Sequence, residues 1–349
     1  MATDEIELQR GLKGVYIDTT ESSRVMGDIG RLVYRGYDIH DLATKSTFEE
    51  TSYLLLYGNL PSSSDLAEFD AQLKSSRSLP SAIFDVISHV KNAHPMDVLR
   101  TAVSALSAFD DEVNDNSREA TLRKAVSLTA RCPVIVAAHH RIRSGLEVIA
   151  PDPNLSQAAN FLYMLSGEIP DADSAKLMDI DFILHADHGS NASAFAARVT
   201  ASTLADLYCA VVTGIGTLKG PLHGGAAEAV MDMALEIGDE DQAEGYVRKV
   251  LDNGGRVMGF GHRVYTALDP RAIHLKEGTL ELGQKQGQPK WFRILSKVEE
   301  VMQPYTAKGI CTNVDFWSGS IYYLLGIPED LFVSIFAMGR VPGWSVQVL

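Results

Sequence analysis

The sequence predicts a mainly α-helical fold with a little β-structure near the N-terminus. Apolar residues recur at helical spacing, between capping residues and glycines, along most of the 349 residues. Short β-branched or aromatic runs between turn residues occur only within 14–36. The sequence has no fixed-period repeat and no low-complexity tract, and its length is that of about two domains.

The first expected elements are strands, in the runs GVYID and RLVYRG of 14–36. Two overlapping capping boxes in 46–50 then start a helix that closes at Gly58. Pro61 and Pro80 each precede a further periodic stretch, as prolines in the first turn of a helix do.

The remainder of the chain is expected to be mostly helical. Helices are predicted near 97–109, 117–146, 155–165, 172–185, 191–213, 224–237, 240–252, 269–285, 290–303, 315–325 and 329–338. Pro133 is expected to kink or divide the segment 117–146. Small side chains along 191–213 let another helix approach closely, either inside one subunit or across a dimer seam. Glycines interrupt 256–265, which is expected to be a partly extended loop.

Composition narrows the class of protein. The net charge of −14 disfavours binding to nucleic acid or to an anionic membrane surface. Cys132, Cys209 and Cys311 form neither a CxxC pair nor an even framework, which is typical of reduced cytosolic thiols. With no signal-peptide pattern and no apolar run of about 18 residues, a cytoplasmic globular protein is expected.

Histidines stand out in two motifs. In HADHG, His185 and His188 follow an apolar helix pattern, and three interpretations are open: a metal site, a helix-end cation, or a ring N–H of His188 offered to an anionic substrate. No further cluster has metal-ligand spacing, so a metal is disfavoured. In GPLHGG, His223 precedes a helix pattern, whose positive end favours a neutral ring able to donate to a developing oxyanion. The alternative is a plain Gly-Pro turn.

The loop around 259–271 is locally basic. Residues 254–276 contain four Lys or Arg residues and one acidic residue, Asp269, a net charge of +3 that suits an anionic ligand. Gly259 and Gly261 are not a dinucleotide fingerprint, because Val264 stands where the third glycine is needed.

One aspartate is a further candidate for the functional site. Asp315, between Val314 and Phe316, is either a helix cap or a partly desolvated general base. Arg340 by itself is an ordinary helix-end cation. Two histidines, one carboxylate and several arginines, without a nucleophile, metal cage or nucleotide loop, suit proton abstraction beside a carbonyl with an anionic co-substrate.

With these motifs in order, the sequence resembles the citrate synthase family in its short bacterial and archaeal-like form, from about residue 11 to the end. The matching segments are GRLVYRGYDIHDLA at 30–43, ILHADHGSNASAFAARVTASTLADLY at 183–208, GTLKGPLHGG at 216–225, VMGFGHRVY at 257–265, DPRA at 269–272, NVDFWSG at 313–319 and FAMGRVPGW at 336–344. The resemblance implies a two-domain multihelical fold, with a large domain of 1–223 plus 327–349 and a mobile small domain of 224–326.

The resemblance also implies a role for each site residue. His223 corresponds to the donor to the acetyl-CoA thioester carbonyl, Asp315 to the base, and His262 to the acid that protonates the oxaloacetate ketone. The oxaloacetate clamp corresponds to His188, Arg271 and Arg340, and the CoA contacts to Arg263, Gly259 and Gly261. Acetyl-CoA and oxaloacetate are the implied partners, in a homodimer without a metal or bound redox cofactor.

The resemblance leaves alternatives open. The sister reaction, 2-methylcitrate synthesis from propionyl-CoA, differs by one methylene, which changes discrimination by only about 1–3 kcal/mol. The others are a non-catalytic CoA- or dicarboxylate-binding paralogue and, more remotely, a metal-dependent hydrolase built on His185 and His188. Thr266 stands where the family often has Lys or Arg, and residues 1–349 lack the family's C-terminal arm, whose Arg reaches the partner's site.

Overall fold

A computed structural model describes residues 18–349, in which the three strands form one small sheet. The strands β1 (Ser23–Met26), β2 (Arg31–Tyr34) and β3 (Tyr37–Asp38) form an antiparallel meander in that order. The strand expected in RLVYRG is confirmed, with Tyr34 opposite Ser23. The strand expected in GVYID falls at 14–18, all but its last residue outside the described part.

Ten helices follow in the first two thirds of the chain. They are α1 (Ile39–Lys45), α2 (Phe48–Tyr57), α3 (Ser63–Ser76), α4 (Ser81–His89), α5 (Pro95–Leu106), α6 (Arg118–Arg143), α7 (Gln157–Ser166), α8 (Ala172–His185), α9 (Ala192–Ala201) and α10 (Leu207–Leu218). Of the two possible capping boxes before α2, the structure forms the one between Thr47 and Glu50. Gly58 ends this helix in the left-handed conformation, as expected.

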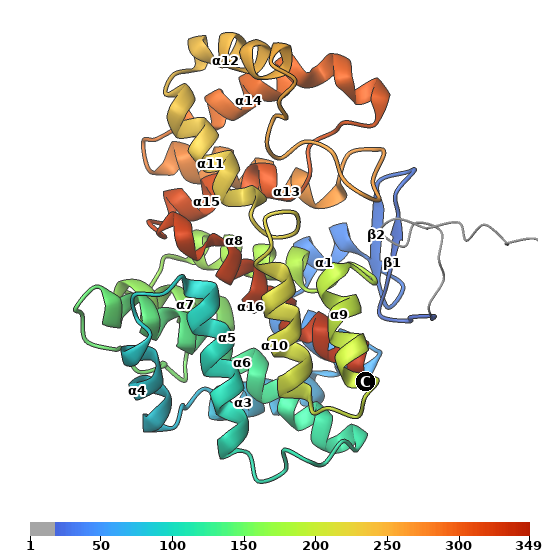
Figure 1. Ribbon diagram of the computed structural model, residues 1–349, viewed down its shortest axis with the longest axis vertical. Coiled ribbons are helices and arrows are strands. Elements are labelled where there is room, and N and C mark those ends of the chain that lie inside the picture. Colours follow the sequence, from blue (N-terminus) through green and yellow to red (C-terminus); the bar gives the residue numbers. More distant parts are fainter. Residues whose placement is uncertain (1–17) are drawn as a thin grey trace, which may run out of the picture.

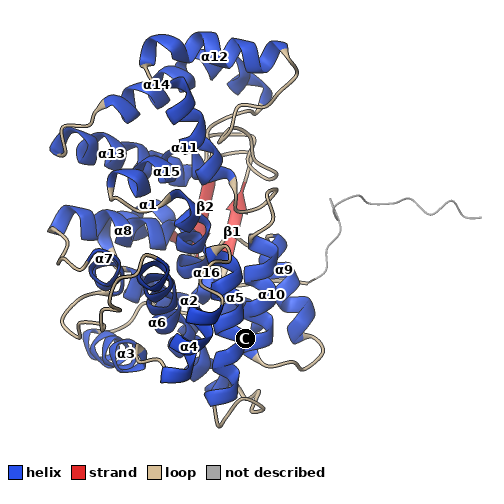
Figure 2. Ribbon diagram, turned by 60° about the vertical axis from the view of Figure 1, so that its left-hand side comes forward, coloured by secondary structure: helices blue, strands red, loops and turns tan. Residues whose placement is uncertain are grey.

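Five further helices come next in the chain. These are α11 (Ala226–Ile237), α12 (Glu240–Asp252), α13 (Pro270–Lys285), α14 (Lys290–Met302) and α15 (Asp315–Leu324), called the upper group below. They pack against one another at the top of Figure 1, and the small sheet lies near their junction with the other helices (Figure 2). The division predicted at 224 and 326 stays a prediction.

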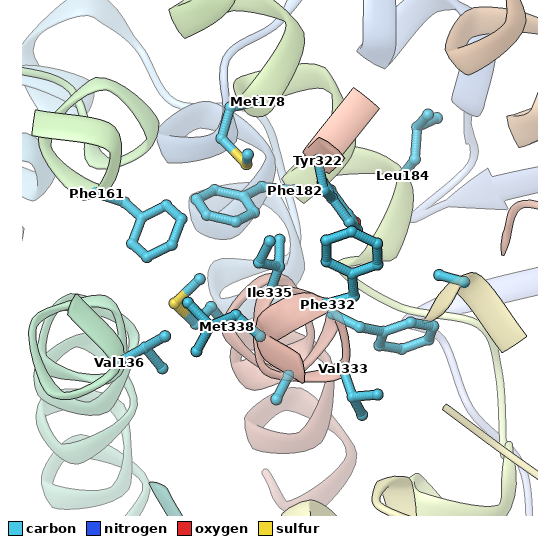
Figure 3. Packing of buried hydrophobic residues seen from close by; sticks show 14 of the residues in the cluster. Val136, Phe161, Met178, Phe182, Leu184, Tyr322, Phe332, Val333, Ile335 and Met338 are labelled. Atoms are coloured by element: carbon cyan, nitrogen blue, oxygen red, sulfur yellow. The ribbon is translucent and has the colours of Figure 1, made fainter. Parts of the chain in front are cut away.

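The last helix, α16 (Phe332–Val348), returns to the first ten helices and is buried along nearly its whole length. Ile335 and Met338 lie on the side of Phe182 of α8 and Val136 of α6, whereas the Phe332 ring packs against Tyr322 at a centroid distance of 5.1 Å (Figure 3). The expected end of this helix near 338 is wrong, because Gly339, Pro342 and Gly343 continue it. At Gly343 a Cβ would lie 2.0 Å from the Ala186 carbonyl oxygen, so glycine is what allows α16 to approach α8.

Pro133 does not divide the helix in which it lies. The structure keeps one continuous α6 from Arg118 to Arg143, so the expected division is wrong, whereas the expected kink stays a prediction. A proline has no N–H for the carbonyl four residues earlier, here that of Thr129. The Gln157 side chain supplies the missing donor, since its Nε2 lies 3.0 Å from the Thr129 oxygen and 3.2 Å from that of Ala130.

The helix expected over 191–213 is two helices, α9 and α10, which pack against each other. Leu204 takes the left-handed conformation at φ 64°, and the Asp206 side chain caps α10 by accepting from the amide of Cys209. Helical periodicity continues across the break, so the small-residue pattern by itself could not reveal it.

Candidate active site

The end of α8 is anchored to the small sheet. Asp187 accepts hydrogen bonds of 2.7 Å from the hydroxyls of Ser22 and Ser23, and the Tyr34 hydroxyl donates to the Asp187 carbonyl at 2.8 Å. Sequence reasoning missed these partners, because they lie more than 150 residues away in the chain. They fix the backbone from which His188 projects.

His188 is buried among groups from other elements. Its Nε2 lies 3.2 Å from the Tyr265 hydroxyl, and its ring centroid lies 5.2 Å from that of His262. Burial, followed by the positive charge of Arg271, lowers the pKa of His188 well below its ordinary value. The ring is therefore neutral at pH 7.

His262 has a defined tautomer. Its Nδ1 accepts from the amides of Val264 at 2.9 Å and Tyr265 at 3.1 Å, so the proton of the neutral ring is on Nε2. Burial, followed by Arg271, lowers its pKa to about 4. His262 thus presents an N–H donor from the loop that the sequence predicted as partly extended.

Arg271 is held by its neighbour Asp269. The carboxylate accepts from Nε at 2.9 Å and from Nη2 at 2.7 Å, and it also accepts from the Val314 amide at 3.2 Å. This pairing joins the start of α13 to the start of α15. Burial opposes ionisation of Asp269, but Arg271 and its hydrogen bonds hold the pKa of Asp269 below its usual range.

Asp315 is the first residue of α15 and does not act as its cap. The residue in the cap position is Val314, and the Oδ1 atom of Asp315 is buried without a hydrogen-bond partner. Burial raises the pKa of Asp315 to about 6, although the charges of His185 and Arg271 oppose this. A buried carboxylate that lacks a partner is poorly stabilised, which makes it a stronger base.

His223 is held by α9. The Ser193 amide donates to His223 Nε2 at 3.2 Å, so the proton of the neutral ring is on Nδ1. The Ser193 hydroxyl also lies 2.9 Å from Nε2, and Trp344 of α16 donates to that hydroxyl at 3.0 Å. Burial and then Arg340 lower the pKa of His223 to about 4, so the ring is neutral at pH 7.

Arg340 lies within α16, fully buried. Its Nε donates to the carbonyl of His185, and its guanidinium lies 4.7 Å from the centroid of the Phe336 ring. Burial lowers its pKa to about 10, which still leaves it charged at pH 7. The sequence interpretation of a helix-end cation is wrong, because α16 continues to Val348.

Electrostatic coupling shows that the predicted residues lie together. Arg271, His262, Arg340 and His223 all depress the pKa of His188, and Arg271 also acts on Asp315. The site therefore combines two neutral rings with known protons, one unpartnered carboxyl oxygen and two buried cations. Ser193, Tyr265 and Asp269 lie in motifs that the sequence singled out, but it gave them no role, because their roles depend on contacts between distant segments.

The three predicted CoA contacts lie on the loop between α12 and α13. Gly259 and Gly261 have φ of 77° and 81°, and Arg263 is exposed. A Cβ at Gly259 would lie 2.7 Å from a ring atom of Phe316, whereas at Gly261 it would meet nothing within 4 Å. Close packing accounts for Gly259, and contact of these three residues with CoA stays a prediction.

Residues 18–349 contain no group of three or more His, Cys, Asp or Glu side chains placed to hold a metal ion. Within the same residues, none of the helices combines the length and the apolar character that crossing a bilayer requires.

Comparison with known proteins gives a consistent result. Residues 11–349 match the family model for the citrate synthase C-terminal domain. The chain is 46% identical to citrate synthase of Haloferax volcanii, over 98% of this chain and 92% of that protein. It is 41% identical to 2-methylcitrate synthase 2 of Corynebacterium glutamicum, over 98% and 91%. A solved complex of Thermoplasma acidophilum citrate synthase with carboxymethyl coenzyme A and oxaloacetate superposes with a TM-score of 0.93 at 32% identity, over 98% and 91%.

Proposed function

The chain belongs to the citrate synthase family, and we propose that it joins acetyl-CoA to oxaloacetate through an enol and then hydrolyses citryl-CoA to citrate and CoA. The observation that carries the mechanism is the unpartnered, buried carboxyl oxygen of Asp315, in a site with two neutral histidines of defined tautomer. Such a set can remove a proton and stabilise the oxyanion that results.

In the first step, Asp315 removes a proton from the methyl group of the thioester. This methyl group is a very weak acid, so the developing enolate oxygen must be stabilised. We assign that task to His223, whose Nδ1–H becomes the donor because Ser193 occupies Nε2. One well-placed donor of this kind contributes roughly 3–4 kcal/mol.

In the second step, the enol carbon attacks the oxaloacetate ketone. His262 protonates the ketone oxygen through Nε2–H, the nitrogen left free by the two amide contacts to Nδ1. Arg271, Arg340 and His188 hold the carboxylates of oxaloacetate. Asp269 occupies only Nε and Nη2 of Arg271, so Nη1 remains as a donor.

The remaining assignments follow from the family. Arg263, Gly259 and Gly261 would contact CoA, which is a substrate, and the reaction would need no resident cofactor. The upper group would close over oxaloacetate and exclude water from the enol. The chain would work in the cytoplasm as a homodimer, in which exposed Val199 and Leu204 of the α9–α10 hairpin support an interface there.

The second candidate is 2-methylcitrate synthesis, favoured by the 41% identity to a 2-methylcitrate synthase. CoA release is therefore measured with oxaloacetate and matched concentrations of acetyl-CoA or propionyl-CoA. A reaction without oxaloacetate corrects for the three cysteines when a thiol reagent is used.

Faster turnover with acetyl-CoA is the expected result. Faster turnover with propionyl-CoA would favour the second candidate. A folded protein that binds CoA but turns over neither thioester would contradict both, and would favour a binding-only paralogue.

A further inference from the structure

His185 lies beside the site but has no part in the mechanism above. It is the last residue of α8 and is buried, with 1% of its surface exposed. Its Nδ1 lies 2.9 Å from the Asp181 carbonyl oxygen and 3.4 Å from Asp181 Oδ1. A carbonyl and a carboxylate only accept, so Nδ1 carries a proton and Nε2 is the nitrogen free to act.

Asp181 is itself fixed from the helix that carries the base. The Tyr322 hydroxyl donates to its carboxylate, at 2.9 and 2.8 Å from the two oxygens. Tyr322 and Asp315 are seven residues apart on α15, which is two helical turns and therefore one face. The series of hydrogen bonds from Tyr322 to Asp181 and from Asp181 to His185 thus links α15 to α8 on the face of α15 that bears Asp315.

Of the residues in this arrangement, His185 and Asp315 each have a buried polar atom without a hydrogen-bond partner. These atoms are Nε2 of His185 and Oδ1 of Asp315. After burial, the charge of His185 is the largest influence on the ionisation of Asp315, and it favours the carboxylate. The Phe336 ring packs against the imidazole at a centroid distance of 4.4 Å and restricts its rotation. A buried polar atom without a partner is costly, so each of these two atoms calls for an explanation.

We propose that His185 is a positioning residue for the base: its Nε2 shares one proton with Oδ1 of Asp315 and leaves Oδ2 to face the substrate methyl group. When the proton is on Nε2, the His185 imidazolium donates to the Asp315 carboxylate. When the proton is on Oδ1, the neutral His185 ring accepts from the Asp315 carboxylic acid. Contacts of this kind are often long without substrate and shorten when it binds. The inference rests on the proposed function of Asp315.

A purely structural role for His185 can be separated from this one. Arg340 is held by the backbone carbonyl of residue 185, which a side-chain substitution does not remove. His185→Asn keeps a donor near Nδ1 for Asp181 and loses Nε2. His185→Gln keeps an amide near the position of Nε2 but cannot exchange a proton there.

The matched control is His139→Asn. His139 is equally buried, with one ring nitrogen 2.9 Å from the Lys91 carbonyl oxygen and the other without a partner. It lies in α6, and the charges that act on it belong to Arg143, Asp330 and His94. Loss of a buried imidazole as such is therefore tested at a place unconnected to Asp315.

The first measurement needs no turnover. The Asp315 carboxyl carbon is followed by NMR across pH 4 to 9 in protein labelled with carbon-13 at the aspartate carboxyl groups, and Asp315→Asn assigns its signal. Both His185 variants are expected to raise the pKa of Asp315, by about one pH unit. An unchanged pKa in both folded variants would overturn the proposal, whether or not the protein synthesises citrate.

The second measurement is steady-state turnover. Both His185 variants are expected to lose about tenfold or more in kcat, to shift the acidic limb of the kcat profile to higher pH, and to keep the KM for oxaloacetate. His139→Asn should leave both kcat and the pH profile of kcat unchanged. A rise in KM with an unmoved pH profile would make His185 a structural support for Arg340 and refute the proposal. Absence of turnover in the unsubstituted protein would refute the proposed function instead.

Discussion

At the scale of single residues, burial gives Asp315 both its basicity and its pH dependence. Its pKa of about 6 in the protein without substrate predicts that kcat/KM for the thioester rises with pH and reaches half of its plateau near pH 6, because only the carboxylate can accept a proton. Asp315→Asn should lower kcat by about 10²- to 10⁴-fold and leave oxaloacetate binding intact. CoA release across pH 5 to 9 and calorimetric titration with oxaloacetate measure these effects. Unchanged turnover in Asp315→Asn would show that another group is the base.

The buried carboxylate of Asp315 also destabilises the folded protein. The pKa of Asp315 in the folded state lies above the ordinary value of 3.8, so the folded state holds more protons than the unfolded state between about pH 4 and 6. The contribution of Asp315 to the free energy of unfolding therefore falls as pH rises through that window.

Asp315→Asn should consequently be more stable than the unsubstituted protein at pH 8, by up to about 3 kcal/mol, since one pKa unit corresponds to about 1.4 kcal/mol. Near pH 4 the difference should vanish. Urea unfolding at both values checks this, and equal stability at pH 8 would mean that the carboxylate is stabilised in the folded protein.

At the scale of elements, Gln157 repairs the gap that Pro133 leaves in α6. Gln157→Met removes its hydrogen bonds to the carbonyls of Thr129 and Ala130 and should cost about 1–3 kcal/mol in unfolding free energy. Pro133→Ala in the same protein restores an N–H for the Thr129 carbonyl and should recover part of the loss. Urea unfolding of the single and double variants tests this, and strictly additive losses would argue against the repair.

The loop between α12 and α13 offers a matched pair of glycines. Both have positive φ, but only at Gly259 would a Cβ collide with Phe316, the residue after Asp315. Gly259→Ala should therefore displace the start of α15 and lower kcat by about tenfold or more, because small misplacements of a catalytic group are costly. Gly261→Ala carries only backbone strain of roughly 1–2 kcal/mol. Equal kcat values in the two folded variants would contradict this argument.

At the scale of the whole molecule, the site is divided between the upper group and the other helices. Asp315 and Arg271 belong to α15 and α13 of the upper group, whereas Arg340 lies in α16, and His188 follows α8. Because oxaloacetate is expected to contact both parts, its binding should draw them together.

Small-angle scattering should therefore show a smaller radius of gyration with saturating oxaloacetate than without it. Arg271→Ala removes the clamp from one side only, and it should abolish that change at the same oxaloacetate concentration. An identical radius in both states of the unsubstituted protein would argue against closure.

The amino-acid sequence is enough to predict the helical class, most helix positions and the residue types of the site. Local patterns predict those features, namely the periodicity of apolar residues, the helix caps and the motifs around His223, His262 and Asp315. Prediction from the sequence failed at two places. At Pro133, the distant Gln157 side chain replaces the donor that the proline lacks, so the helix continues. At Asp206, a capping side chain divides a continuous pattern of small residues into two helices.

The protonation of the site, in contrast, depends on the tertiary structure. The ring protons of His223 and His262 are placed by backbone amides, and the pKa of Asp315 is set by burial. The partners that bury these groups come from segments far apart in the chain, such as α8, α9 and α16. Desolvation and hydrogen bonding depend on what surrounds a group in space, which local sequence patterns do not encode.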